Sequence, residues 1–147
     1  MAFIRPVSGF LAALIVMIVL GSIASTHFVL LGLSDLGTEI ALSDRLSMTL
    51  QDIGGIAPLY GAIFGTGLLI AFIVAIFVTR LAPSLRWLVY TVAGATAMLV
   101  TMIALQVAFD GIMPISGART TGGFLAQIAV GALAGFTFAS LTPRRTA

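Results

Sequence analysis

The fold is decided by one uncharged stretch, Gly123-Phe-Leu-Ala-Gln127-Ile-Ala-Val-Gly131-Ala-Leu-Ala-Gly135-Phe-Thr-Phe-Ala139. A small residue or an amide recurs at every fourth position, which places these side chains on one face of a helix. Small residues at this spacing let two helix backbones approach closely within a bilayer, where close packing and hydrogen bonds drive association. The stretch therefore predicts a membrane helix against which the other helices pack.

The composition places the rest of the chain in the same class. Hydrophobic residues make up 60% of the 147 residues, charged residues make up 8%, and the mean hydropathy is +1.19. Soluble domains carry about 25% charged residues. Cysteine is absent, which excludes disulfides and zinc–thiolate sites within this sequence. The basic residues are all arginine and are scattered, so the net charge of +2 gives no indication of a nucleic-acid partner.

Four uncharged stretches are long enough to cross a bilayer, which takes roughly 20 apolar residues. They cover residues 7–32, 56–79, 87–109 and 123–141. The connections are outer loops at 33–55 and 110–122 and a cytoplasmic turn at 80–86. We therefore predict an all-α integral membrane protein, a single domain over 1–147 in which four transmembrane helices form an antiparallel bundle.

The first stretch has a second interpretation as a secretory signal peptide. Arg5 precedes an apolar run, and Ser22-Ile-Ala24 has the small-x-small pattern of a cleavage site. The apolar run continues past that site through Phe28-Val-Leu-Leu. We therefore expect an uncleaved first helix.

The first outer loop carries its own helical pattern. Leu42, Leu46, Leu50 and Ile53 recur every three or four residues, Ser43 is a plausible N-cap, and Gly54-Gly55 is a plausible stop. This pattern predicts a short amphipathic helix over 43–53 that lies at the membrane surface. An ordered connecting loop is the alternative.

The charges predict the orientation. One side of the predicted bundle carries five arginines and no acid: Arg5, Arg80, Arg86, Arg144 and Arg145. The other side carries two arginines and all five acids: Arg45, Arg119, Asp35, Glu39, Asp44, Asp52 and Asp110. Basic residues mark the cytoplasmic side of short connections. We therefore expect both termini in the cytoplasm and the protein in a bacterial inner membrane.

A second row of small residues lies in the second span, where Gly61 and Gly65 form a GxxxG pair. With Gly123, Gly131 and Gly135 they are the predicted helix-packing residues. Two such rows in a small chain predict close helix contacts, either with copies of this chain or with other membrane helices in a larger complex.

Polar side chains gather in the outer halves of the spans. His27, Tyr60, Gln106 and Gln127 fall within a layer roughly 10–15 Å thick at 1.5 Å per residue. They have two interpretations. They are interhelical hydrogen-bonding groups or headgroup-level residues, or they line an outward-facing pocket for a lipid headgroup, a quinone or a small solute. The sequence favours the first interpretation. A charged group inside a membrane costs much free energy and therefore indicates a function, whereas an uncharged polar group costs less and is a weaker indication.

No span holds an Asp, Glu, Lys or Arg, and proton-coupled transport usually needs such a group. The single histidine cannot supply bis-histidine haem ligation within one chain, and we expect no metal and no cofactor. The sequence thus favours a non-enzymatic multi-pass protein that acts through helix packing, as an accessory or assembly subunit or a small homo-oligomer. The alternatives are a transporter or channel for a neutral or amphiphilic solute, or a quinone- or lipid-binding protein that uses the outer pocket.

Overall fold

Four long helices dominate the computed structural model, which describes residues 4–37 and 41–142. They are α1 (Ile4–Asp35), α2 (Leu42–Leu81), α3 (Arg86–Ala108) and α4 (Thr121–Leu141), with short 3-10 turns η1 (Pro83–Leu85) and η2 (Ser116–Ala118). These residues contain no strand. All four helices are long and apolar enough to cross a membrane. The prediction of an all-helical chain with four such helices is confirmed.

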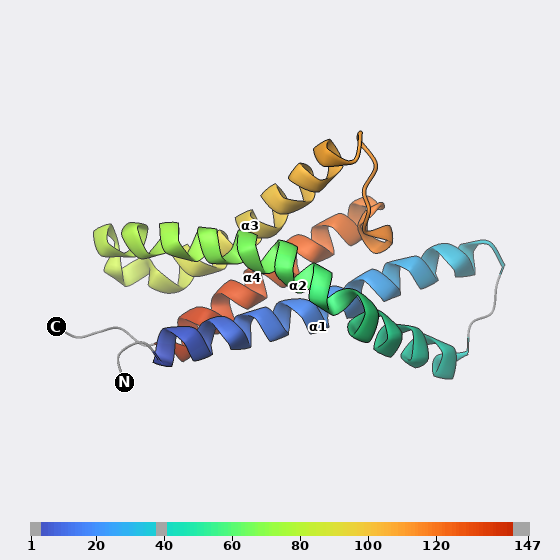
Figure 1. Cartoon of the computed structure of the whole chain (residues 1–147), viewed down its shortest axis with the longest axis horizontal. Helices are drawn as coiled ribbons and strands as arrows, with labels where there is room; N and C mark the ends of the chain where they lie inside the picture. The colour runs from blue at the N-terminus through green and yellow to red at the C-terminus, as the bar shows by residue number, and fades with distance from the viewer. Residues whose placement is uncertain (1–3, 38–40, 143–147) are drawn as a thin grey trace.

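The chain turns back on itself at each connection (Figure 1). The beginning of α1, the turn between α2 and α3 and the end of α4 lie at one end of the molecule, on the left in Figure 1. The end of α1, the beginning of α2 and the connection between α3 and α4 lie at the other end. The most extensive pairings are α4 with α3 and α4 with α1, and α2 packs on α3 and α1. The sequence stretch that predicted a packing hub thus lies in α4, the helix that takes part in both of the most extensive pairings.

Helices α3 and α4 touch through their backbones. A methyl group built on Gly94 of α3 would overlap the carbonyl oxygen of Gly131, and one built on Gly131 would overlap the carbonyl oxygen of Gly94. Gly135 meets the Tyr90 carbonyl oxygen in the same way. Only glycine permits this approach, which is how small residues serve membrane helix packing.

The second helix corrects one prediction. The segment 43–53 is not a separate surface helix, because α2 runs without a break from Leu42 through Gly54, Gly55 and Pro58. Glycine lowers helix stability by about 1 kcal/mol per residue but does not end a helix by itself. Pro58 lacks the N–H that would bind the Gly54 carbonyl, so the helix is weakened at this point without being ended. Helix also covers most of residues 33–55, for which we expected a loop, since α1 extends to Asp35 and α2 begins at Leu42.

The surface of the helices is apolar along much of its length. On α2 the side chains of Leu69, Ile70, Ile73, Val74 and Phe77 are all exposed. Soluble monomers rarely expose contiguous apolar areas of this kind, and such areas mark membrane or protein contacts.

Candidate functional site

A buried hydrogen-bonded chain joins three helices at mid-length. The Tyr60 hydroxyl of α2 donates to Gln127 Oε1 of α4 at 2.7 Å. Gln127 Nε2 donates to the Gly21 carbonyl oxygen of α1 at 2.9 Å. Gln127 is 1% exposed and Tyr60 is 5% exposed. Buried polar groups of this kind are stable only when their hydrogen bonds are made, so the two side chains fix each other's positions.

Gly21 makes this junction sterically feasible. The Tyr60 hydroxyl lies directly against Gly21, and a Cβ atom there would overlap the hydroxyl oxygen. A larger residue at position 21 would push Tyr60 away from Gln127. Glycine at this one point therefore brings α1 and α2 close enough to share the amide of α4.

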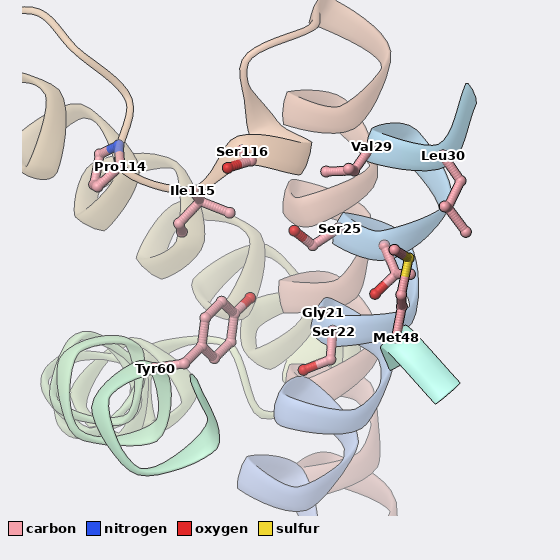
Figure 2. Close-up of a pocket in the computed structure, with 11 residues that line it drawn as sticks. Gly21, Ser22, Ser25, Val29, Leu30, Met48, Tyr60, Pro114, Ile115 and Ser116 are labelled. Atoms are coloured by element: carbon pink, nitrogen blue, oxygen red, sulfur yellow. The ribbon is translucent and has the colours of Figure 1, made fainter. Parts of the chain in front are cut away.

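A cavity of about 320 Å³ lies beside this junction, toward the end of the molecule where α1 ends. Figure 2 shows that α1 forms one wall, that Tyr60 points its hydroxyl across from α2, and that residues 114–116 lie beyond both. The lining residues are Gly21, Ser22, Ser25, Thr26, Val29, Leu30, Met48, Tyr60, Pro114, Ile115 and Ser116. None of them is charged. The volume is at the lower end of the range found for small-molecule sites.

Three of the lining hydroxyls are not used by the protein. Within 4–37 and 41–142, no hydrogen bond joins the hydroxyl of Ser22, Ser25 or Ser116 to another residue. Ser22 is only 6% exposed. Serine and threonine in helices commonly donate to the carbonyl one turn back, as Thr66 and Ser140 do here. The three serines instead leave hydrogen-bonding capacity in the cavity.

The inner end of the cavity is closed by apolar side chains. Beyond the Tyr60–Gln127 pair lie Met17, Phe64 and Leu68, each at most 2% exposed. The Phe64 ring packs on the Tyr60 ring with 4.4 Å between centroids. The described residues therefore offer no polar path from the cavity to the other end of the bundle.

The structure brings together two of the four residues predicted for the polar cluster. Tyr60 and Gln127 meet, whereas His27 is exposed and its ring makes an edge contact with Phe28. His27 follows the buried Thr26 by one position, which turns its side chain about 100° around the helix and away from the cavity. Gln106 is partly buried on α3, a helix that contributes no residue to the cavity lining. His27 and Gln106 are therefore not among the described residues that line this cavity.

The predicted packing glycines fall into two groups. Gly123, Gly131 and Gly135 face backbone atoms of neighbouring segments, where no Cβ fits. Gly61 and Gly65 face the side chains of Ile18 and Leu14 on α1, with a Cβ 3.0 and 2.9 Å from the nearest atom. Every one of the five therefore lies at a contact within the chain.

Several residues at the cavity were not predicted to line a binding site. The sequence analysis placed Ser22, Ser25 and Thr26 in the outer half of the first span only as part of a general polar layer. Their spacing, with Gly21 beside them, places them on one helix face and was the available signal. No sequence signal pointed to Ser116 and Gly117, because they precede α4 in a segment whose path the sequence does not define. Gly117 brings that segment against the backbone of Ser25, where a Cβ would overlap it.

The lining of the cavity combines hydroxyl groups with apolar side chains. The described residues of the lining include the Tyr60 phenol but no carboxylate, imidazole or thiol. General acid–base catalysis needs a titratable group near the operating pH, and nucleophilic catalysis by a serine needs an adjacent base. Across the described ranges, no group of three or more His, Asp or Glu residues is arranged to hold a metal ion.

Comparisons with models of protein families, with curated proteins and with solved structures found no match.

Proposed function

We propose that this protein is an integral membrane protein whose four helices form an antiparallel bundle across the bilayer. The support is the combination of four sufficiently long apolar helices and an apolar exterior. In water such a surface would aggregate, whereas in lipid tails it has no cost.

The distribution of charge supports an orientation with both termini in the cytoplasm of a bacterium. Arg5, Arg80 and Arg86 lie at the end of the molecule where α1 begins, and no acid lies there among the described residues. Asp35, Asp44 and Asp110 lie at the opposite end, together with Arg45 and Arg119. With arginines on the cytoplasmic side, the cavity opens in the outer half of the membrane.

In this orientation the protein binds a neutral amphiphilic molecule in the hydroxyl-lined cavity. The observation that carries this proposal is Ser22, a serine that is more than nine-tenths buried, lines the cavity and has no partner among the described residues. Its hydroxyl oxygen is open to the cavity, because no fully buried side-chain oxygen among the described residues lacks a hydrogen-bond partner. A ligand can bond to this accessible hydroxyl and place its apolar body against Val29, Leu30 and Met48.

Two other functions fit the geometry less well. A channel or transporter needs a route to the cytoplasmic end, and Met17, Phe64 and Leu68 fill that route. A subunit that acts only through helix packing was inferred from the rows of small residues. Those rows pack within the chain, so they do not call for a second chain.

Blocking the cavity tests the proposal. Ser116 is exposed at the cavity rim, and Ser116→Phe should fill the cavity without disturbing the helix contacts. Ser84→Phe is the matched control, because Ser84 is an exposed serine in the other 3-10 turn, at the far end of the molecule.

The readout is the neutral lipid retained by each protein in native mass spectrometry. The wild type and Ser84→Phe should retain one molecule per chain, and Ser116→Phe should lose it. If the wild type retains none, or if Ser116→Phe retains as much as the control, the proposal is wrong.

A further inference from the structure

The hydrogen-bond partners of Gln127 determine the acceptor to which the Tyr60 hydroxyl donates its proton. The Gly21 carbonyl oxygen only accepts hydrogen bonds, so the Gln127 atom at 2.9 Å from it must be the amide nitrogen. The other end of the amide, which lies 2.7 Å from the Tyr60 hydroxyl, is then the oxygen. That oxygen is also only an acceptor. Tyr60 must therefore donate its one proton to Gln127.

The donation of this proton to Gln127 determines which hydrogen bonds Tyr60 can still make in the cavity. A phenol has one O–H to donate, and its oxygen also accepts. With the proton held by Gln127, only the acceptor side of Tyr60 remains at the inner end of the cavity. The nearby Ser22 and Ser25 hydroxyls rotate freely and both donate and accept. The inner end thus holds one obligatory acceptor beside groups that adapt to either role.

We propose that the ligand of this cavity is a neutral alcohol, recognised by the donation of its O–H to the Tyr60 oxygen while its own oxygen accepts from a serine. The inference rests on the proposed binding function and names the class of ligand. A long-chain alcohol or an acylglycerol with a free hydroxyl meets both requirements. A quinone, a ketone or an ether offers only acceptors and leaves the acceptor side of the Tyr60 hydroxyl unused. Sites built around a buried polar group discriminate strongly against analogues that lack its partner.

The outer part of the cavity fits the apolar body of such a molecule. Val29, Leu30, Met48, Pro114 and Ile115 supply most of the lining away from Tyr60. Figure 2 draws Met48 in front of α1 and Leu30 at its right edge, with Tyr60 on the left. The ligand therefore inserts its hydroxyl toward Tyr60 and leaves its chain toward Met48.

A matched pair of probes tests the inference. Dodecan-1-ol and 1-methoxydodecane differ by replacement of the O–H proton with a methyl group. Their apparent Kd values follow from the rise in the melting temperature of the protein in lipid nanodiscs as each probe is added. In the wild type the alcohol should bind about tenfold more tightly than the ether, as expected for one additional buried hydrogen bond.

Gln127→Met tests the role of the tyrosine proton. Methionine is of similar length but accepts no comparable hydrogen bond, so Tyr60 regains a proton to donate. The alcohol-to-ether ratio should fall to about one, and a ketone, 2-tridecanone, should bind more tightly than it does to the wild type. Thr66→Val is the control, since Thr66 is exposed on α2 and bonds to its own helix at Ala62. It should keep the wild-type ratio.

The ratio is measured within each variant, so a general loss of stability weakens both probes and leaves it unchanged. If Gln127→Met does not fold, Tyr60→Phe replaces it, and the same fall in the ratio is expected. Equal binding of alcohol and ether by the wild type, with both lost in Ser116→Phe, would overturn the inference and leave the proposed binding function standing. No binding of either probe would overturn both.

Discussion

Gly94 of α3 and Gly131 of α4 lie so close that neither position has room for a Cβ atom, because each glycine faces the carbonyl oxygen of the other. This contact holds the most extensively paired helices of the molecule together. We predict that Gly131→Ala lowers the free energy of unfolding by about 1–3 kcal/mol, as is typical of overpacking. Thermal unfolding in detergent measures the loss. A wild-type melting temperature for this variant would show that the two helices do not pack as described.

Replacement of Gly54 by alanine should stabilise the protein, in contrast to the same replacement at Gly131. A Cβ atom on Gly54 would meet nothing within 4 Å, and the same is true of Gly55. These glycines weaken α2 without serving a contact, so Gly54→Ala should stabilise the protein by up to about 1 kcal/mol. The measurement is the same melting experiment, with Gly32→Ala as a comparison, because Gly32 of α1 also faces open space. Destabilisation by Gly54→Ala would indicate a contact at this point that the described residues do not contain.

Arg86 links the beginning of α3 to the end of α4. Its guanidinium donates to the Ala139 carbonyl oxygen at 2.7 Å and to Thr142 Oγ1 at 2.6 Å. A cation is also favourable beside the last carbonyl groups of a helix. Arg86→Met should lower the free energy of unfolding by about 1.5–3 kcal/mol.

The control for Arg86 is Arg80→Met. Arg80 is exposed, with its guanidinium carbon 5.5 Å from the centre of the Phe77 ring on its own helix. Its replacement should change stability by less than about 0.5 kcal/mol. Equal effects of the two substitutions would mean that the Arg86 hydrogen bonds do not stabilise the bundle.

His27 should be dispensable for ligand binding. Its side chain is exposed and is not part of the cavity lining. We predict that His27→Gln keeps both the apparent Kd for dodecan-1-ol and the melting temperature of the wild type. The titration in nanodiscs described for the probe pair measures both quantities. A tenfold loss of affinity would place His27 at the ligand and contradict the assignment of the cavity residues.

The helices and their main contacts could be predicted from the sequence because they depend on composition and on one spacing. A long uncharged run predicts a helix in a bilayer, and Gly131 and Gly135 on one face predict a close neighbour. The continuation of α2 through Gly54-Gly55 was not predictable, because glycine lowers helix stability and the sequence does not say whether the neighbouring turns compensate.

The candidate site was only half predictable for a similar reason. Tyr60 and Gln127 are long polar side chains that need partners wherever they are buried, so their pairing could be anticipated. A helical serine can satisfy itself by bonding to its own backbone. The sequence therefore could not show that Ser22 and Ser25 leave their hydroxyls unpaired in a cavity. For His27, the sequence indicates the depth of the residue along α1 but not the direction in which its side chain faces.

Photo-crosslinking tests the central claim, that the cavity binds a neutral amphiphile, most directly. A long-chain alcohol that carries a diazirine next to its head group would be irradiated with the protein in nanodiscs, and the modified peptides would be mapped by mass spectrometry. Binding in the cavity predicts labels concentrated on residues 21–30 and 113–116 and removed by excess dodecan-1-ol. Labels spread over the exposed face of α2 at residues 69–77, and unaffected by the competitor, would contradict it.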